Sequence, residues 1–111
     1  MTELKITRDK KGLVAYGVNF SDTGSIVSML ASTNDSLAVP AGADFALFQF
    51  TPGATVLVGT GSVSIPVPGI AFTSASEDIN PEGRSLYNVS TLQFYAETAS
   101  LVKVSFYKVN A

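Results

Sequence analysis

The sequence predicts an all-β protein, a single jelly-roll-like antiparallel β-sandwich of about eight or nine short strands. Three observations support this prediction. Short runs rich in β-branched and aromatic residues recur between turn signals, at the spacing of about 8–12 residues typical of sandwiches and barrels. No segment shows the helical period of about 3.6 residues. Residues 36–59 include a strand that is apolar on both faces, as expected inside a sandwich or beneath a partner.

The strands are expected to follow one another along the chain, separated by short turns. The predicted strands are residues 3–8, 13–20, 25–31, 36–39, 43–50, 54–59, 63–72, 89–96 and 100–109. Residues 22–24 and the polar cluster 32–36 are predicted turns, because they are rich in Asp, Asn, Ser, Thr and Gly.

The strand at residues 43–50 has an apolar side chain at nearly every position. Its two faces are expected to hold Phe45, Leu47 and Gln49 on one side and Ala46, Phe48 and Phe50 on the other. A type II turn is predicted at Pro52-Gly53, with Gly53 at positive φ. Type II turns twist poorly for tight hairpins, so the chain either makes a longer loop here or passes from one sheet to the other. Passage between sheets suits a jelly roll.

The C-terminal run LVKVSFYKVN alternates cleanly, with Val102, Val104 and Phe106 on one side. The preceding run LQFYAETAS is expected to pair with it as a hairpin in the middle of the fold. Residues 73–88 are the one long stretch without a strand pattern, and residues 80–83 predict a turn within it. Such a stretch is either a functional loop or a surface connection with one helical turn.

Composition predicts one domain, residues 1–111, with part of its surface covered by another molecule. Hydrophobic residues make up 46% of the chain and charged residues 14%, against about 25% charged in an average soluble domain. The net charge of −2 disfavours binding to nucleic acid. The absence of cysteine fits folding in a reducing cytoplasm. Neither a signal peptide nor a membrane-spanning segment is evident.

Basic residues are concentrated at the N-terminus. Lys5, Arg8, Lys10 and Lys11 are four of the seven basic residues in the chain, whereas residues 12–83 contain acidic residues and no basic one. Residues 1–11 are therefore interpreted either as a basic arm that reaches a partner or as the solvated flank of an N-terminal strand.

The residues needed for common catalytic sites are missing, so the protein is not expected to be an enzyme. Without histidine and cysteine, the chain cannot form a Ser-His-Asp triad, a Cys-His pair or a histidine-rich metal site. No phosphate-binding glycine loop is present, and neither a cofactor nor a metal is expected. Most aromatic residues are assigned to the core: Tyr16, Phe20, Phe45, Phe48, Phe50, Phe72, Phe94 and Phe106. Tyr87, Tyr95 and Tyr107 are left as candidates for exposed aromatic contacts.

Two segments, SLAVPAGADFALFQFTPGATVLVG and STLQFYAETASLVKVSFYKV, together resemble small accessory β-sandwich proteins of tailed-phage virions. The resemblance covers residues 35–60 and 88–109, and is greatest to the capsid-decorating (cement) proteins of Salmonella podoviruses of the epsilon-fifteen type. It implies a jelly-roll domain that is made in the host cytoplasm, binds the outer surface of the assembled capsid and braces neighbouring major capsid subunits. Self-association as a homodimer is also expected.

Partner contacts are expected from the basic arm and from the 73–88 stretch. The candidate partner-binding residues are Lys5, Arg8, Lys10, Lys11, Glu77, Asp78, Arg84 and Tyr87. Two alternatives to a head protein remain open from the sequence. One is a carbohydrate-binding module associated with a phage tail or fibre, and the other is an adaptor with a different partner.

Overall fold

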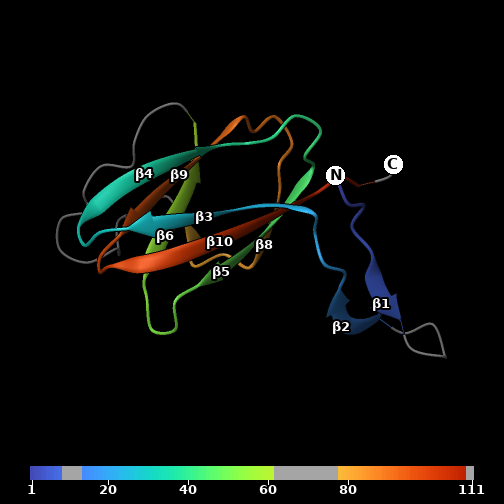
Figure 1. The fold of residues 1–111 in the computed structure, drawn as a ribbon, viewed down its shortest axis with the longest axis horizontal. Helices are drawn as coiled ribbons and strands as arrows, with labels where there is room; N and C mark the ends of the chain where they lie inside the picture. The colour runs from blue at the N-terminus through green and yellow to red at the C-terminus, as the bar shows by residue number, and fades with distance from the viewer. Residues whose placement is uncertain (9–13, 62–77, 110–111) are drawn as a thin grey trace.

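The computed structural model describes residues 1–8, 14–61 and 78–109, which form strands without any helix (Figure 1). The strands are β1 (Ile6–Arg8), β2 (Val14–Val18), β3 (Thr23–Met29), β4 (Thr33–Ala38), β5 (Phe45–Phe50), β6 (Val56–Thr60), β7 (Asp78–Ile79), β8 (Gly83–Ser85), β9 (Thr91–Ala96) and β10 (Ser100–Tyr107). The predicted strand at 63–72 lies outside the described residues.

Eight of these strands form two four-stranded antiparallel sheets that pack face to face. The first sheet has the order β3-β10-β5-β8, and the second has the order β4-β9-β6-β7. All of the strand pairs in both sheets are antiparallel. Figure 1 looks onto the side of the sandwich formed by β3 and β4, with the second sheet above the first. Two four-stranded sheets in this order form a jelly roll, so the predicted fold class is confirmed.

The chain changes sheet at the Pro-Gly turn, which is one of the two alternatives that the sequence left open. β5 belongs to the first sheet and β6 to the second. Gly53 has φ of 80°, and the amide of Ala54 donates to the carbonyl oxygen of Thr51 at 3.0 Å, closing the turn. This φ is comfortable for glycine and strained for residues with a Cβ atom.

The core lies between the two sheets and is built from alternate residues of the strands. Phe94 of β9 and Phe106, Val102 and Val104 of β10 are completely buried. Phe48 of β5 packs edge-on against Phe94, with ring centroids 6.5 Å apart. The predicted placement of residues 102, 104 and 106 on one side of the strand is therefore confirmed, and that side faces the core.

The predicted C-terminal hairpin is wrong. β9 pairs with β4 and β6 in the second sheet, whereas β10 pairs with β3 and β5 in the first. Both strands do occupy inner positions of their sheets. The short connection at residues 97–99 thus crosses between layers, because both strands have an apolar face that must meet the same core.

Three strands lie where the sequence predicted turns or loop. The predicted turn at 32–36 belongs largely to β4, which pairs along its length with β9. Residues 73–88, predicted to lack strands, contain β7 and β8. β4 is polar and largely exposed, and β7 and β8 span two and three residues. Strands this short or this polar leave no recognisable alternation in the sequence.

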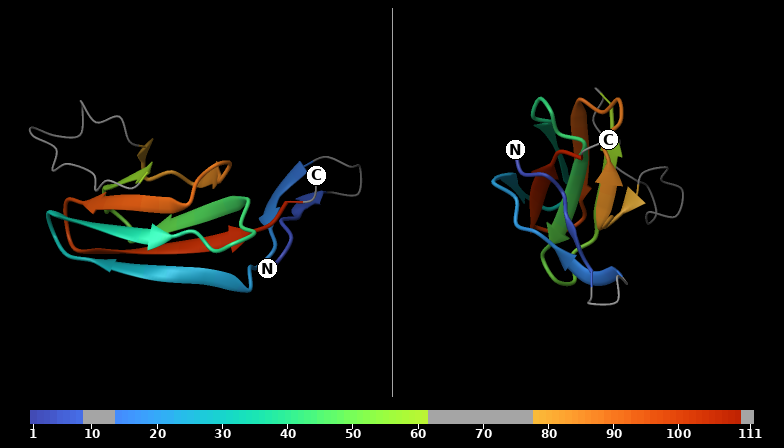
Figure 2. Two further views of the ribbon diagram at one scale, coloured as in Figure 1. Left: turned by 90° about the horizontal axis from the view of Figure 1, so that it is seen from above. Right: turned by 90° about the vertical axis from the view of Figure 1, so that its right-hand side faces the viewer.

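A separate two-stranded sheet, β1-β2, extends beyond one end of the sandwich (Figure 2). The segment before β1 is tied to the end of β10. The amide of Leu4 donates a hydrogen bond to the carbonyl oxygen of Lys108 at 2.9 Å. The amide of Lys108 donates one to the carbonyl oxygen of Thr2 at 3.0 Å. The first five residues are therefore attached to the sandwich along their backbone.

Candidate interaction surface

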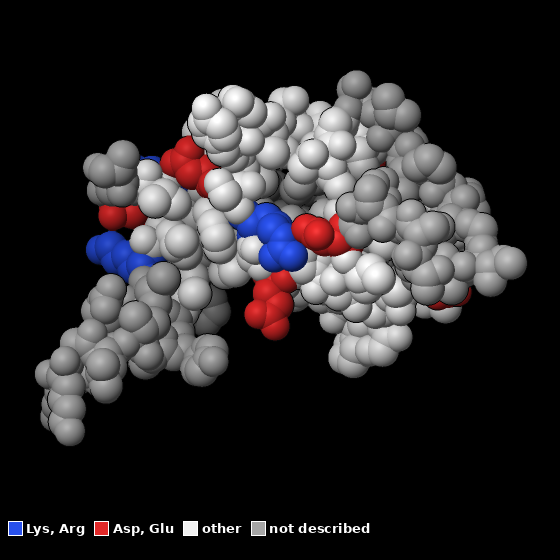
Figure 3. Space-filling view, turned by 180° about the vertical axis from the view of Figure 1, so that it is seen from behind, with Lys and Arg blue, Asp and Glu red and all other residues white. Residues whose placement is uncertain are grey.

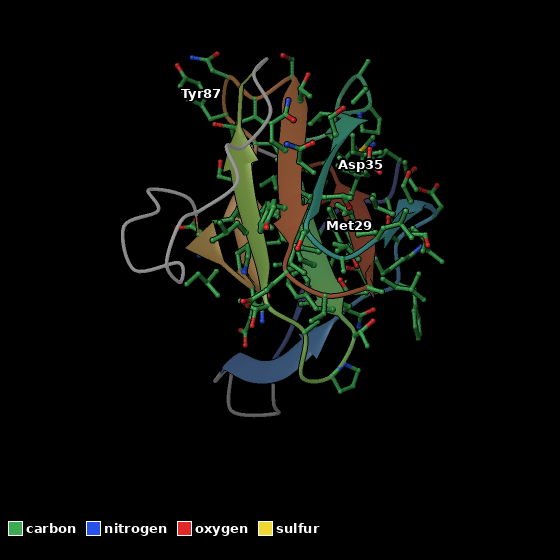
Figure 4. All side chains as sticks on the ribbon, turned by 90° about the vertical axis from the view of Figure 1, so that its left-hand side faces the viewer. Met29, Asp35 and Tyr87 are labelled. Carbon is green, nitrogen blue, oxygen red and sulfur yellow. The ribbon has the colours of Figure 1, made fainter. Side chains whose placement is uncertain are left out.

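The structure brings together only some of the predicted partner-binding residues. Lys5 is exposed in the segment before β1, and Arg8 ends β1. Tyr87 follows β8 and is 83% exposed, and Figure 4 shows it on a different part of the surface from Asp35 of β4. Lys10, Lys11 and Glu77 lie outside the described residues.

Asp78 and Arg84 form an exposed ion pair across the β7–β8 connection. Arg84 Nε lies 2.9 Å from Asp78 Oδ2, and Arg84 also donates to the carbonyl oxygen of Gly83 at 2.7 Å. Both residues line a hollow of about 340 Å³, together with Phe48, Leu86 and other core residues. An exposed pair of this kind contributes about 0–1 kcal/mol to stability.

The outer face of the first sheet carries exposed apolar side chains on two neighbouring strands, β3 and β10. We call this surface the first-sheet face. It consists of the outward residues Gly24, Ile26, Ser28, Phe45, Leu47, Gln49, Gly83, Ser85, Leu101, Lys103, Ser105 and Tyr107. Ile26 is 66% exposed and Leu101 is 52% exposed. Lys103 is the single charged residue among these positions.

Two hollows lie on the first-sheet face, and Gln49 and Lys103 line both. The smaller, of about 240 Å³, is also lined by Ile26, Leu101 and neighbouring residues of β5 and its turn. The larger, of about 740 Å³, lies toward the β1-β2 end and is lined there by Val18 and Phe20 among others. Phe20 is 98% exposed, so its assignment to the core is wrong.

Two glycines allow side chains of this face to lie flat against the sheet. A Cβ atom at Gly24 would come within 2.8 Å of Lys103 Nζ, so the lysine side chain lies across Gly24 toward the edge strand β3. A Cβ atom at Gly83 would come within 2.7 Å of the Phe45 ring. The absence of a Cβ atom thus leaves room for the Lys103 side chain at Gly24 and for the Phe45 ring at Gly83.

Tyr107 anchors the N-terminal segments to the first sheet. Its hydroxyl donates to the carbonyl oxygen of Asn19, and the Asn19 side chain in turn donates to the carbonyl oxygen of Glu3 at 2.8 Å. Burial raises the pKa of Tyr107 above its ordinary value. Tyr107 is 3% exposed and Tyr95 is 4% exposed, so their expected role as exposed aromatics is wrong.

Asp22 holds the chain start against the same end of the sandwich. It accepts hydrogen bonds from the hydroxyl of Thr23 and the amide of Thr2, both at 2.9 Å. Its carboxylate also lies 3.9 Å from the N-terminal amino group. Hydrogen bonding by Thr23 first, and then by Thr2, lowers the pKa of Asp22.

The outer face of the second sheet has a different character. Leu57, Gln93 and Tyr95 point away from the core on β6 and β9, yet they are 0%, 4% and 4% exposed. Nε2 of Gln93 donates to the carbonyl oxygen of Gly61 at 2.8 Å. Leu57 and Tyr95 of the second sheet are thus covered, whereas Ile79 of β7 and Ile26 and Leu101 of the first sheet are exposed.

The four outer strands also differ in how well their free edges are protected. β7 and β8 are two and three residues long, and β4 carries Asp35. β3 is seven residues long and contains neither a charged residue nor proline. Short strands and charges protect edges from pairing with other chains, so β3 has the least protected edge of the four.

The described residues offer no metal-binding chemistry. Within 1–8, 14–61 and 78–109, no three His, Cys, Asp or Glu residues lie close enough together to hold a metal ion. Figure 3 shows basic and acidic side chains lying side by side near the middle of the side that it views. Among the described residues, no helix is long and apolar enough to cross a membrane.

Comparisons of the chain with models of known protein families, with curated proteins and with solved structures give no match. The geometry of this chain therefore carries the functional argument. The residues that sequence reasoning missed are Ile26, Lys103 and the exposed Phe20. The alternation in residues 101–107 placed Leu101 and Lys103 on a common face, but alternation does not show whether that face is covered.

Proposed function

We propose that the protein is a non-enzymatic structural protein of a phage virion that binds the outer surface of the capsid and braces neighbouring major capsid subunits. The observation that carries this proposal is the first-sheet face, on which exposed Ile26 and Leu101 lie beside Lys103, the one charged residue of that face. A surface of this kind is typical of sites that bind another protein. The resemblance of residues 35–60 and 88–109 to capsid-decorating proteins supports the choice of partner.

Bracing of a capsid requires contact area and a rigid domain, and no reaction chemistry. Contacts of modest strength, repeated over a lattice of identical sites, hold a scaffold firmly when one molecule engages two subunits at once. The two packed sheets provide rigidity. Ile26 and Leu101 line the smaller hollow and Phe20 lines the larger one, so exposed apolar residues provide contacts at two places.

We further propose that the protein pairs with a second copy of itself through β3. Antiparallel pairing of two β3 strands about Ile26, the middle residue of Thr23–Met29, would join two first sheets into one continuous sheet. Sedimentation equilibrium should show a dimer that Ile26→Lys dissociates, since a charge would stand at the centre of the pair. Ile79→Lys on β7 is the matched control and should leave the dimer intact. A monomer at high protein concentration would contradict dimer formation in solution.

The location of the protein is tested by its copy number in purified virions of a phage whose genome encodes it. Quantitative mass spectrometry should find a number of copies comparable with that of the major capsid protein. A few copies per particle would instead place the chain in the tail. Absence from the virion would overturn the proposal.

The second candidate is a carbohydrate-binding module of a phage tail or fibre. The observation in its favour is the exposure of two aromatic rings, Phe20 at 98% and Tyr87 at 83%. Aromatic platforms support sugar binding when they line one groove, whereas Phe20 follows β2 and Tyr87 follows β8. Saturable binding of a soluble host saccharide, abolished by Tyr87→Ala, would favour this function over capsid binding.

A further inference from the structure

We propose that the first-sheet face is the capsid-docking surface and that Lys103 pairs there with a carboxylate that the partner presents between apolar side chains. The inference rests on the proposed function and adds the surface and the chemistry of the partner segment.

The apolar part of this surface lies on neighbouring strands in register. Lys103 of β10 stands opposite Ile26 of β3 on one side and Gln49 of β5 on the other. Leu101 lies two residues along β10, on the same face as Lys103. Ile26, Leu101 and the half-buried Phe50 line the hollow of about 240 Å³, which gives a partner side chain a concave apolar contact.

Lys103 has a defined position and no acidic partner among the described residues. Its side chain lies across Gly24, where the missing Cβ atom leaves room for it, and it is partly buried. The ion pairs within the described residues are those of Met1 with Asp22 and of Arg84 with Asp78. Glu82 lines the larger hollow with Lys103 but forms no ion pair with it. A lysine held over apolar surface keeps its ammonium group available to a partner.

The single positive charge of the first-sheet face indicates which kind of partner can bind there. Two copies of the chain placed face to face would bring two Lys103 groups together, and the outward positions of the four strands supply no carboxylate. Like charges in an interface oppose association. One cation is also too few for nucleic acid or an anionic membrane, which are bound by clusters of basic residues. A protein segment with a carboxylate flanked by apolar side chains matches both features.

The first experiment measures binding to heads assembled without this protein. Purified protein is mixed with such heads, and bound protein is quantified after pelleting. Leu101→Ser and Lys103→Glu should each weaken binding by about tenfold, the effect of removing roughly 1.4 kcal/mol of interface free energy. Ile79→Ser is the matched control for Leu101, since both side chains are 52% exposed. Lys108→Glu is the control for charge reversal.

The second experiment tests the pairing directly. A carbodiimide reagent joins a lysine amine to a carboxylate without a spacer, so decorated heads should give a cross-link from Lys103 to an Asp or Glu of the capsid protein. Mass spectrometry of peptides identifies both ends. Leu101→Ser should reduce the yield of this cross-link in proportion to the loss of binding.

The outcomes separate the two proposals. If the unaltered protein fails to bind heads, the proposed function is overturned, together with the inference that rests on it. If the unaltered protein binds and the Leu101 and Lys103 variants bind equally well, capsid binding stands and this docking surface is wrong. Should Lys103→Gln bind normally but aggregate in solution, Lys103 serves solubility and the proposed ion pair is wrong.

Discussion

Truncation of Phe48 to alanine should remove a large part of the stability of the fold. Phe48 is 6% exposed, stacks on Phe50 with ring centroids 6.3 Å apart, and meets Phe94 edge-on. Loss of a buried phenylalanine costs about 3–5 kcal/mol, because apolar contacts disappear and a cavity remains. Phe48 also lines the hollow of about 340 Å³ beside Arg84, so the space left by truncation adjoins an existing hollow. We therefore expect a loss of about 3 kcal/mol, at the lower end of this range.

The matched control for Phe48→Ala is Phe20→Ala. Both changes remove the same atoms, but Phe20 is 98% exposed. Exposed substitutions of this kind usually change stability by no more than about 0.5 kcal/mol. Urea denaturation followed by far-UV circular dichroism gives the free energy of unfolding of each variant. Because a domain has only about 5–15 kcal/mol to lose, Phe48→Leu serves as a milder second variant with a smaller expected loss.

Equal losses of unfolding free energy in the Phe48→Ala and Phe20→Ala variants would show that Phe48 does not lie in a packed core. A loss below about 1 kcal/mol for Phe48→Ala would also show this, since that result is typical of a residue outside a packed core. A normal free energy of unfolding combined with failed capsid binding would place Phe48 in an interface instead.

Three further predictions concern the connections around the sandwich. Tyr107→Phe should lower the free energy of unfolding by about 0.5–1.5 kcal/mol at neutral pH. Because folding raises the pKa of Tyr107, the parent protein should lose stability as the pH rises above the ordinary tyrosine pKa of 10.0. The Tyr107→Phe variant should lose less stability over the same pH range. Asn80→Ala should lower the free energy of unfolding by about 1–3 kcal/mol. The reason is that the Asn80 side chain accepts a hydrogen bond from the amide of Val56 at 2.8 Å and donates one to the carbonyl oxygen of Ala54 at 2.7 Å. Asn88→Ala is the control, because it removes another asparagine at positive φ. Deletion of residues 1–11 should leave the thermal unfolding transition of the sandwich in place, because β1 pairs with β2 alone. Capsid binding should become weaker and less dependent on salt. Loss of the thermal transition would show that the backbone hydrogen bonds of Thr2 and Leu4 are essential to the fold.

The β-sandwich class could be read from the sequence because strands and turns leave local patterns in the chain. The alternation at Val102, Val104 and Phe106 placed these residues on one side of the strand without reference to any other strand, and the structure buries that side. The Pro52-Gly53 pair identified a turn whose twist fits a change of sheet. These signals are local in the chain, and local conformational preferences determine them.

The choice of strand partners could not be read in the same way. The apolar face of β9 fits equally well beside β10 or across the core from it, since alternation shows which side is buried and not which neighbour supplies the hydrogen bonds. β7 and β8 were missed because two or three residues are too few for a period to show. Their positions follow from the long-range pairing with β6 and β5.

The candidate site depended most on tertiary structure. The sequence determined that charges are few and that Leu101 and Lys103 share a side of one strand. Only the packed sheets decided that this side faces solvent while Leu57 and Tyr95 are covered, and that Gly24 of a distant strand gives Lys103 its place. The physical reason is that exposure depends on what packs above a residue. A residue's own local sequence does not determine what lies above it in the fold.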